Sequence, residues 1–175
     1  FIRFAGDRLV SMSEIRSAVS DDAEQIRDIY NHYVLNSLVT FDLNPTDTQF
    51  WQNKIEHLNH KKLPFLVLVE DDLVIGFAYC APFREKAAYD ATVESTIYIH
   101  KEHLGKKHGK VLFEELLREA KNADVKQVLA VISAEGADAS IRLTEQLGFT
   151  EKGRLSDVGY KFDKWLSIVI MQKSL

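Results

Sequence analysis

The sequence predicts a single-domain α/β (α+β) protein in which helices flank a mixed central β-sheet. Two observations support this fold class. Segments with apolar residues at helical spacing alternate with short runs of apolar and β-branched residues that are typical of strands. The 175 residues contain no internal repeat, low-complexity stretch or linker, and this length suits one domain.

The first half of the chain is predicted to form a strand, two helices and a hairpin. We expect a short strand at Ile15–Val19, followed by a helix that the polar cluster Ser20–Asp22 can cap. A second helix is expected to begin at Pro45–Asp47. The apolar run Phe65–Val69 is typical of a buried strand, and a turn joins it to a partner strand at Val74–Ala81.

The second half is predicted to alternate strands and helices. Thr92–His100 is rich in β-branched residues and favours a strand, whereas Gly109–Lys121 has the apolar spacing of a helix. Val125–Ser133 favours a strand and Ala139–Leu147 a helix, with Gly148 as its C-terminal cap. Two short strands are expected to end the fold, at Gly153–Leu155 and Leu166–Gln172.

The composition argues against several classes of protein. A net charge of -4 disfavours nucleic-acid binding, because phosphate recognition usually requires a basic excess. No apolar stretch approaches the ~20 residues of a membrane span, so no membrane association is predicted. Cys80 is the single cysteine and lies in an apolar run, which favours a buried structural thiol in a reducing, cytoplasmic setting.

The first eleven residues are expected to lie outside the folded domain. Residues 1–11 precede Met12 and resemble an expression leader. Arg3, Asp7 and Arg8 interrupt any apolar core, which disfavours a signal peptide. We therefore predict a domain that spans residues 12–175.

A glycine-containing turn joins the strand Thr92–His100 to the next predicted helix. Unpaired backbone N–H groups and the positive end of the helix dipole meet at such a position and favour an anion. Cations there oppose the dipole, each at a cost of ~0.3–1 kcal/mol. The basic side chains at this turn are nevertheless Lys106, Lys107, His108 and Lys110. They indicate a polyanion site; the alternative is a solvated basic loop.

Two charged residues near this turn are candidates for chemistry. Glu94 lies in an otherwise β-branched strand, where partial burial would raise its pKa and suit it to act as a general base. Alternatively, Glu94 is one of the solvent-facing side chains of a strand whose side chains alternate between the two faces of the sheet. Arg84 could hold a carboxylate with its bidentate fork, or it is an ordinary surface arginine.

Three histidines invite comparison with metal sites. His100, His103 and His108 lie close together in sequence, with Glu102 among them. Taken together they match no closed zinc pattern, and Cys80 is distant in sequence. We predict no metal.

The chain resembles the GCN5-related N-acetyltransferase (GNAT) family, and more narrowly the phosphinothricin and methionine sulfoximine N-acetyltransferases. The region Val93–Leu117 is similar to the acetyl-CoA motif of the family. Further matching segments, spread from Ile15 to Leu175, are Ile29–His32, Val39–Phe41, Ala81–Arg84, Ala88–Tyr89, Thr92–Ser95, Ile97–Ile99, Ser140–Leu143, Leu147–Phe149, Val158–Phe162 and Trp165.

The resemblance implies a splayed sheet, acetyl-CoA as acetyl donor, a small amino-acid-like substrate, a detoxification role and a homodimer. Glu94 would be the general base. The residues implied to bind acetyl-CoA are Ile97, Tyr98, Ile99, Gly105, Lys106, Lys107, His108, Gly109, Lys110 and Gly136. Those implied to line the substrate site are Arg84, Glu94, Ser95, Tyr30, Phe41, Tyr89 and Lys161.

The sequence departs from the family pattern at three single positions and in the segment Glu135–Asp138, which lacks an Asn that the family often carries a few residues before Ser140. In the pyrophosphate loop, Lys107 replaces a glycine and Leu104 replaces a polar residue. Thr144 stands where many relatives carry a Tyr or His that can protonate the departing thiolate, so no general acid is assigned. The alternatives to an amino-acid N-acetyltransferase are a GNAT enzyme for another amine (a polyamine, an aminoglycoside or a protein N-terminus), a non-catalytic acyl-CoA-binding module, and a purely structural domain.

Overall fold

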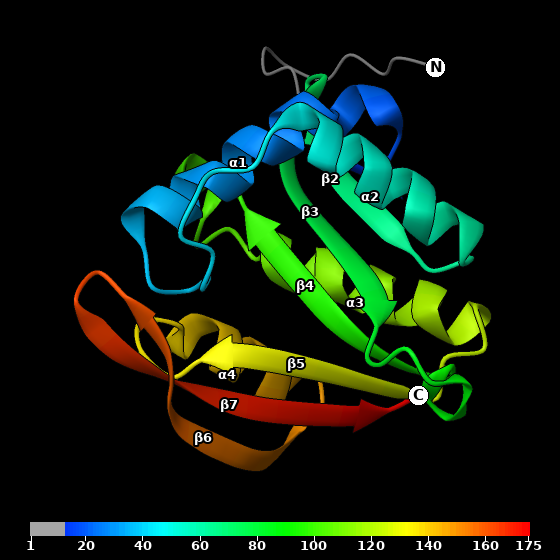
Figure 1. Ribbon diagram of the computed structural model, residues 1–175. Helices are drawn as coiled ribbons and strands as arrows, with labels where there is room; N and C mark the ends of the chain where they lie inside the picture. Colours follow the sequence, from blue (N-terminus) through cyan, green and yellow to red (C-terminus); the bar gives the residue numbers. More distant parts are fainter. Residues whose placement is uncertain (1–12) are drawn as a thin grey trace.

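The computed structural model describes residues 13–175. The strands in this range form one sheet with the order β1-β2-β3-β4-β5-β7-β6 (Figure 1). The strands are β1 Ser13–Ser17, β2 Phe65–Glu70, β3 Leu73–Pro82, β4 Thr92–Ile99, β5 Gln127–Ser133, β6 Thr150–Lys161 and β7 Lys164–Ser174. The helices are α1 Ala23–Asn36, α2 Thr48–His60, α3 His108–Asn122 and α4 Asp138–Gln146, with short 3-10 turns η1 Ser20–Asp22, η2 Ala87–Tyr89 and η3 Lys101–His103. The predicted leader and the domain start at residue 12 lie outside the described residues.

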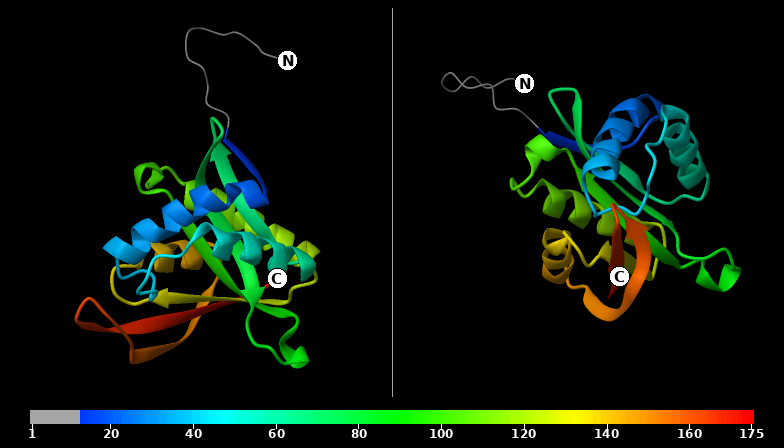
Figure 2. Two further views of the ribbon diagram at one scale, coloured as in Figure 1. Left: turned by 45° about the horizontal axis from the view of Figure 1, so that its top comes forward. Right: turned by 60° about the vertical axis from the view of Figure 1, so that its left-hand side comes forward.

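Two helical layers cover opposite faces of the sheet. Helices α1 and α2 pack on one face, while α3 and α4 lie on the other, as the right-hand view of Figure 2 shows. Trp51 of α2 and Phe77 of β3 are fully buried in one apolar cluster, and Leu112 and Leu116 of α3 are fully buried in another. Each face therefore has its own apolar core, and the predicted α/β fold with flanking helices is confirmed.

The sheet is splayed at its centre. Strands β4 and β5 are its parallel neighbours, and they pair only over Thr92–Glu94 and Gln127–Leu129. Beyond this point the strands diverge (Figure 1). The Ser95 hydroxyl donates a hydrogen bond of 3.0 Å to the Leu129 carbonyl where they part. The rest of β4 still pairs with β3, so its edge toward β5 has backbone groups without a strand partner.

Several local predictions hold. Asp47 caps α2 by accepting a hydrogen bond of 2.8 Å from the Phe50 N–H. Gly148 follows α4 with φ +83°, the left-handed conformation that ends many helices. Cys80 is completely buried, and burial raises the pKa of its thiol to about 12.

None of the described helices is long and apolar enough to cross a membrane.

The predicted bounds of the first strand are wrong. The strand ends at Ser17 rather than Val19, because the Val19 N–H donates to the Asp22 carboxylate at 2.8 Å instead of to a neighbouring strand. Arg16 donates to both oxygens of the same carboxylate, at 2.7 and 2.8 Å. These bonds turn the chain from β1 into η1.

The last two strands are much longer than predicted. They form a hairpin whose turn residues, Phe162 and Asp163, have φ values of +50° and +58°. The pairing of β6 with β7 skips from Leu155 to Gly159, so a bulge interrupts the regular alternation of side chains within β6.

Candidate functional site

The splay between β4 and β5 opens a cavity of about 730 Å³. Its walls come from β4, from β5, from the segment between η3 and α3, and from α4. The predicted site residues in its lining are Glu94, Ser95, Ile97, Tyr98, Ile99, Gly105, Lys107, His108, Gly109, Lys110 and Gly136. Most of the residues predicted to bind acetyl-CoA are therefore brought together. Lys106 is exposed and does not belong to this lining.

One end of the cavity is the loop that leads into α3. Gly105 and Lys107 have φ values of +77° and +64°, so the chain here twice adopts the left-handed conformation. Lys107 is the N-cap residue, and the first helical bonds run to its carbonyl from the Lys110 and Val111 N–H groups. The N–H groups before Lys110 thus have no partner within the helix and are available to an anion.

The basic side chains of this loop are solvent-exposed. Lys106, Lys107 and Lys110 all belong to the exposed class, and Lys110 lies 3.9 Å from the Glu114 carboxylate on the next turn of α3. Exposed charges act through solvent, and salt screens them. The loop therefore offers fixed backbone donors and a more diffuse positive field to a polyanion.

Glu94 lies where β4 and β5 part. It pairs with Ala81 on β3 and Leu129 on β5, and its half-buried side chain lines the cavity. Burial raises the pKa of the Glu94 carboxyl above its usual value, while the positive charges of Arg84 and Lys54 partly oppose this rise. A carboxylate with a raised pKa in a cavity suits proton transfer near neutral pH.

Arg84 and Tyr89 line a separate pocket on the loop after β3, not the main cavity. The Arg84 guanidinium stacks at 4.8 Å on the Phe83 ring, and Phe83 in turn contacts Tyr89 edge to face at 5.8 Å. Arg84 still lies close enough to Glu94 to lower its pKa. The Arg84 guanidinium therefore approaches the Glu94 carboxylate from outside the cavity.

Three other predicted substrate residues lie outside both described pockets. The Tyr30 hydroxyl donates to Asp42 at 2.6 Å and contacts the Thr40 hydroxyl at 2.8 Å. The buried Lys161 ammonium donates to the Thr40 carbonyl at 2.9 Å, and burial lowers its pKa. Phe41 packs on Gly159, where an added Cβ would lie 2.5 Å from its ring. These residues join the segment after α1 to the β6–β7 hairpin.

Sequence reasoning did not assign Tyr33, Leu143 or Lys54 to the site. Tyr33 lines the cavity and donates to the Ile99 carbonyl at 2.5 Å, and Leu143 of α4 also belongs to the lining. Lys54 of α2 reaches the Tyr79 hydroxyl at 3.1 Å and influences Glu94. Thr144 lines the cavity, and its hydroxyl donates within α4 to the carbonyls of Ser140 or Ile141. Only the apolar spacing of α1 and α4 could have indicated Tyr33 and Leu143.

Comparison with known proteins agrees with this geometry. Residues 15–170 match the family model described as the acetyltransferase (GNAT) domain. The chain belongs to the GNAT family. The predicted family, its splayed sheet and its class of enzyme, the N-acetyltransferases, are thereby confirmed.

Several GNAT relatives match nearly the whole chain. A phosphinothricin N-acetyltransferase of Streptomyces viridochromogenes is 38% identical over 160 residues, covering 91% of this chain and 86% of that protein. An L-methionine sulfoximine/L-methionine sulfone acetyltransferase of Salmonella typhimurium is 35% identical over 164 residues, covering 92% and 94%. A phosphinothricin acetyltransferase of Sinorhizobium meliloti, solved in complex with acetyl-CoA, has a TM-score of 0.89 at 32% identity, covering 93% and 88%.

Proposed function

We propose that this GNAT protein transfers an acetyl group from acetyl-CoA directly to the amino group of a small amino-acid-like substrate. The observation that carries the proposal is the cavity between β4 and β5, which has anion-binding backbone groups at one end and Glu94 at the other. A long donor molecule with a polyphosphate at one end and a reactive thioester at the other fits this polarity.

The donor would use the two features of the cavity separately. Its pyrophosphate would meet the N–H groups of Gly105, Lys107 and His108 at the start of α3, with Lys106 and Lys110 adding positive charge. Its pantetheine arm would lie along the unpaired edge of Ile97–Ile99 and take the place of a neighbouring strand. Gly136 supports the proposal from the β5 side, because it lines the cavity with φ +78°.

Glu94 is the proposed general base. The substrate arrives as an ammonium, and the Glu94 carboxylate would take one proton from it. The free amine then attacks the thioester carbonyl, a C–N bond forms, and the C–S bond breaks as the thiolate leaves. The second proton of the attacking nitrogen passes to the thiolate, so the products are the N-acetylated amino acid and the free thiol. A backbone N–H on the free edge of β4 is the proposed donor to the oxyanion. Positioning the amine and the thioester together supplies much of the rate.

Arg84 is proposed to select amino-acid-like substrates. Its guanidinium can form two parallel hydrogen bonds to a carboxylate, and it lies near Glu94. A positive charge at this place disfavours polyamines and aminoglycosides. The substrates of the relatives, phosphinothricin and methionine sulfoximine or sulfone, are the proposed substrates here, with detoxification as the biological role. Tyr89 flanks Arg84, while Tyr30, Phe41 and Lys161 would shape the site indirectly.

We also propose a homodimer that acts in the cytoplasm. The β6–β7 hairpin has a cluster of exposed apolar side chains, namely Leu155, Val158, Tyr160, Phe162 and Trp165. Trp165 is 62% exposed and Tyr160 is 53% exposed. Exposed apolar side chains gathered on one hairpin favour a protein partner, and the proposed partner is a second copy of the chain. Sedimentation at several concentrations tests this. Acetyl-CoA as donor and a free buried thiol both suit the cytoplasm.

A substrate panel tests the activity. Thiol release from acetyl-CoA is measured with phosphinothricin, methionine sulfoximine, methionine sulfone, spermidine and an aminoglycoside. Turnover confined to the three amino acids is expected. Turnover with the cationic amines alone would overturn the substrate assignment. Acetyl-CoA binding without turnover on a wider set of amines would favour the non-catalytic binding module instead.

A further inference from the structure

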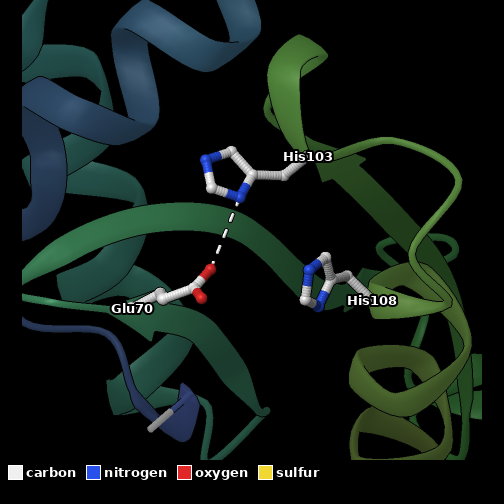
Figure 3. Close-up of side chains that lie close together, drawn as sticks. All are labelled: Glu70, His103 and His108. Carbon is white, nitrogen blue, oxygen red and sulfur yellow. Dashed lines mark ion pairs between the residues drawn. The ribbon is translucent and has the colours of Figure 1, made fainter. Parts of the chain in front are cut away.

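Three side chains that are far apart in the sequence meet beside the cofactor loop. Glu70 ends β2, His103 belongs to η3, and His108 begins α3. One oxygen or nitrogen atom from each lies within 4.8 Å of those from the other two. Figure 3 shows the three side chains pointing toward a common space, with Glu70 entering from the sheet and the two imidazoles from the opposite side.

Two imidazole nitrogens in this group have no hydrogen-bond partner. His103 Nδ1 and His108 Nε2 are both buried, and nothing within residues 13–175 donates to or accepts from them. Leaving a buried polar atom without a hydrogen-bond partner is unfavourable. A metal ion would remove this cost, because an unprotonated imidazole nitrogen is a good ligand for zinc-like cations.

The spacing of the atoms also suits a metal. His103 Nδ1 and Glu70 Oε2 lie 3.5 Å apart, which is within ion-pair range for a protonated imidazole but long for a hydrogen bond. Two ligand atoms bound tetrahedrally to one Zn²⁺ lie about 3.3 Å apart, given metal–ligand distances of about 2.0–2.2 Å. Separations of up to 4.8 Å would need to close by roughly 1.5 Å, within reach of side-chain rotation.

The sequence around the two histidines and the local charges are compatible with a metal. Four residues separate His103 from His108, a spacing that occurs between paired zinc ligands. The prediction of no metal rested on His100, His103 and His108 together, and it lacked Glu70, which only the fold brings to the group. The Glu70 carboxylate offsets part of the metal's charge, while the neighbouring loop lysines are exposed and screened.

We propose that Glu70, His103 and His108 form a binding site for a divalent transition metal of the zinc class. Three protein ligands leave a fourth position for water. The metal would join the end of β2 to the segment Lys101–His108, which carries the loop at the α3 end of the cavity. This inference does not depend on the proposed acetyl transfer.

The test is metal binding by the full chain after treatment with a chelator. Zn²⁺ affinity is measured by competition with a chromophoric chelator, and Co²⁺ serves as a spectroscopic probe of the ligands. We expect one equivalent to bind, an intense visible Co²⁺ spectrum typical of tetrahedral N/O ligation, and a higher melting temperature with Zn²⁺.

Single substitutions identify the ligands. Glu70→Gln, His103→Gln and His108→Gln are each expected to weaken Zn²⁺ binding by more than about tenfold. His100→Gln is the matched control, because His100 lies in the same segment but outside the group, and it should bind Zn²⁺ as the wild type does. Glu70→Gln is the decisive variant, because Glu70 does not line the cavity. Without metal, this variant should bind acetyl-CoA with the same affinity as the wild type.

Two results would overturn the site. One is Zn²⁺ binding of equal strength in the wild type and in Glu70→Gln and His108→Gln, which would indicate adventitious surface binding. The other is no stoichiometric binding by folded wild-type protein. Circular dichroism of each variant without metal separates lost ligation from lost folding, and an unfolded single variant leaves the other two to decide.

Discussion

The two ends of the cavity differ in how they use charge. At one end, Glu94 is half-buried where β4 and β5 part, and desolvation raises its pKa. At the other, Lys106, Lys107 and Lys110 are exposed around the start of α3. A partly desolvated charge interacts strongly with few neighbours, whereas exposed charges interact weakly and additively. Chemistry should therefore depend on single residues at the first end, and donor binding on many small contributions at the second.

The sheet creates this difference. Pairing over Thr92–Glu94 closes β4 against β5 and partly buries the carboxylate, while the divergence that follows exposes the edge of β4 and leads to the loop. Ser95 lies at the boundary and holds Leu129 through its hydroxyl. One break in strand pairing thus produces both a desolvated end and an open end.

The largest expected effect is at Glu94. Glu94→Gln keeps the size and hydrogen-bonding capacity of the side chain but cannot accept the proton. We expect kcat to fall by about 10²–10⁴-fold, with the acetyl-CoA dissociation constant changed by less than about twofold. Steady-state kinetics and calorimetry check this together. An unchanged kcat would remove Glu94 from the base role.

Arg84 should affect substrate binding more than donor binding. Arg84→Ala is expected to raise KM for the amino acid by about 10- to 100-fold, the range for a lost hydrogen bond to a charged group. Arg84→Lys should recover only part of this loss, because it restores the charge without the fork. Lys86→Ala on the same loop is the matched control and should leave KM unchanged. Equal effects at both positions would contradict a specific carboxylate contact.

The pH dependence of the rate should reveal the raised pKa of Glu94. The active form is the carboxylate, so activity is lost as pH falls through this pKa, which burial raises above the usual value of a glutamate. The substrate ammonium titrates at higher pH, so the rate already falls with pH before Glu94 is protonated. Protonation of Glu94 should therefore add a second break to the pH–rate profile, below which the rate falls more steeply. Arg84 lowers the pKa of Glu94, so Arg84→Ala should move this break to higher pH. A break that persists in Glu94→Gln would belong to another group.

The smallest expected effects are at Lys107. Its φ of +64° is strained for a side chain with a Cβ, so Lys107→Gly should raise the free energy of unfolding by up to about 1 kcal/mol. Lys107→Ala keeps the strain and should not be stabilised. Both changes remove one exposed cation, and both should weaken acetyl-CoA binding by only a few-fold, less at high salt. A gain in stability for the alanine variant would argue against strain.

The sequence predicts the middle of the fold better than its ends. Phe65–Glu70 and Thr92–Ile99 were predictable because continuous apolar or β-branched runs mark buried strands. The full length of β6 and β7 was not, because Phe162 and Asp163 make the turn without a glycine and a bulge after Leu155 interrupts the alternation.

The candidate site shows a similar division. The loop residues and Glu94 are close together in the sequence, and the family resemblance located them in one motif. Local patterns could not show that Lys161 and Thr40, distant in sequence, are joined by a hydrogen bond, nor that Tyr33 faces the cavity. Such contacts depend on how α1 and the last hairpin pack, which only the folded structure determines.

A crystal structure of the protein with acetyl-CoA would show whether the space between β4 and β5 holds the donor. We expect the pyrophosphate on the backbone N–H groups between Gly105 and Lys110, the pantetheine arm along Ile97–Ile99, and the thioester beside Glu94. A donor bound outside the space between β4 and β5, or a thioester far from Glu94, would contradict this expectation.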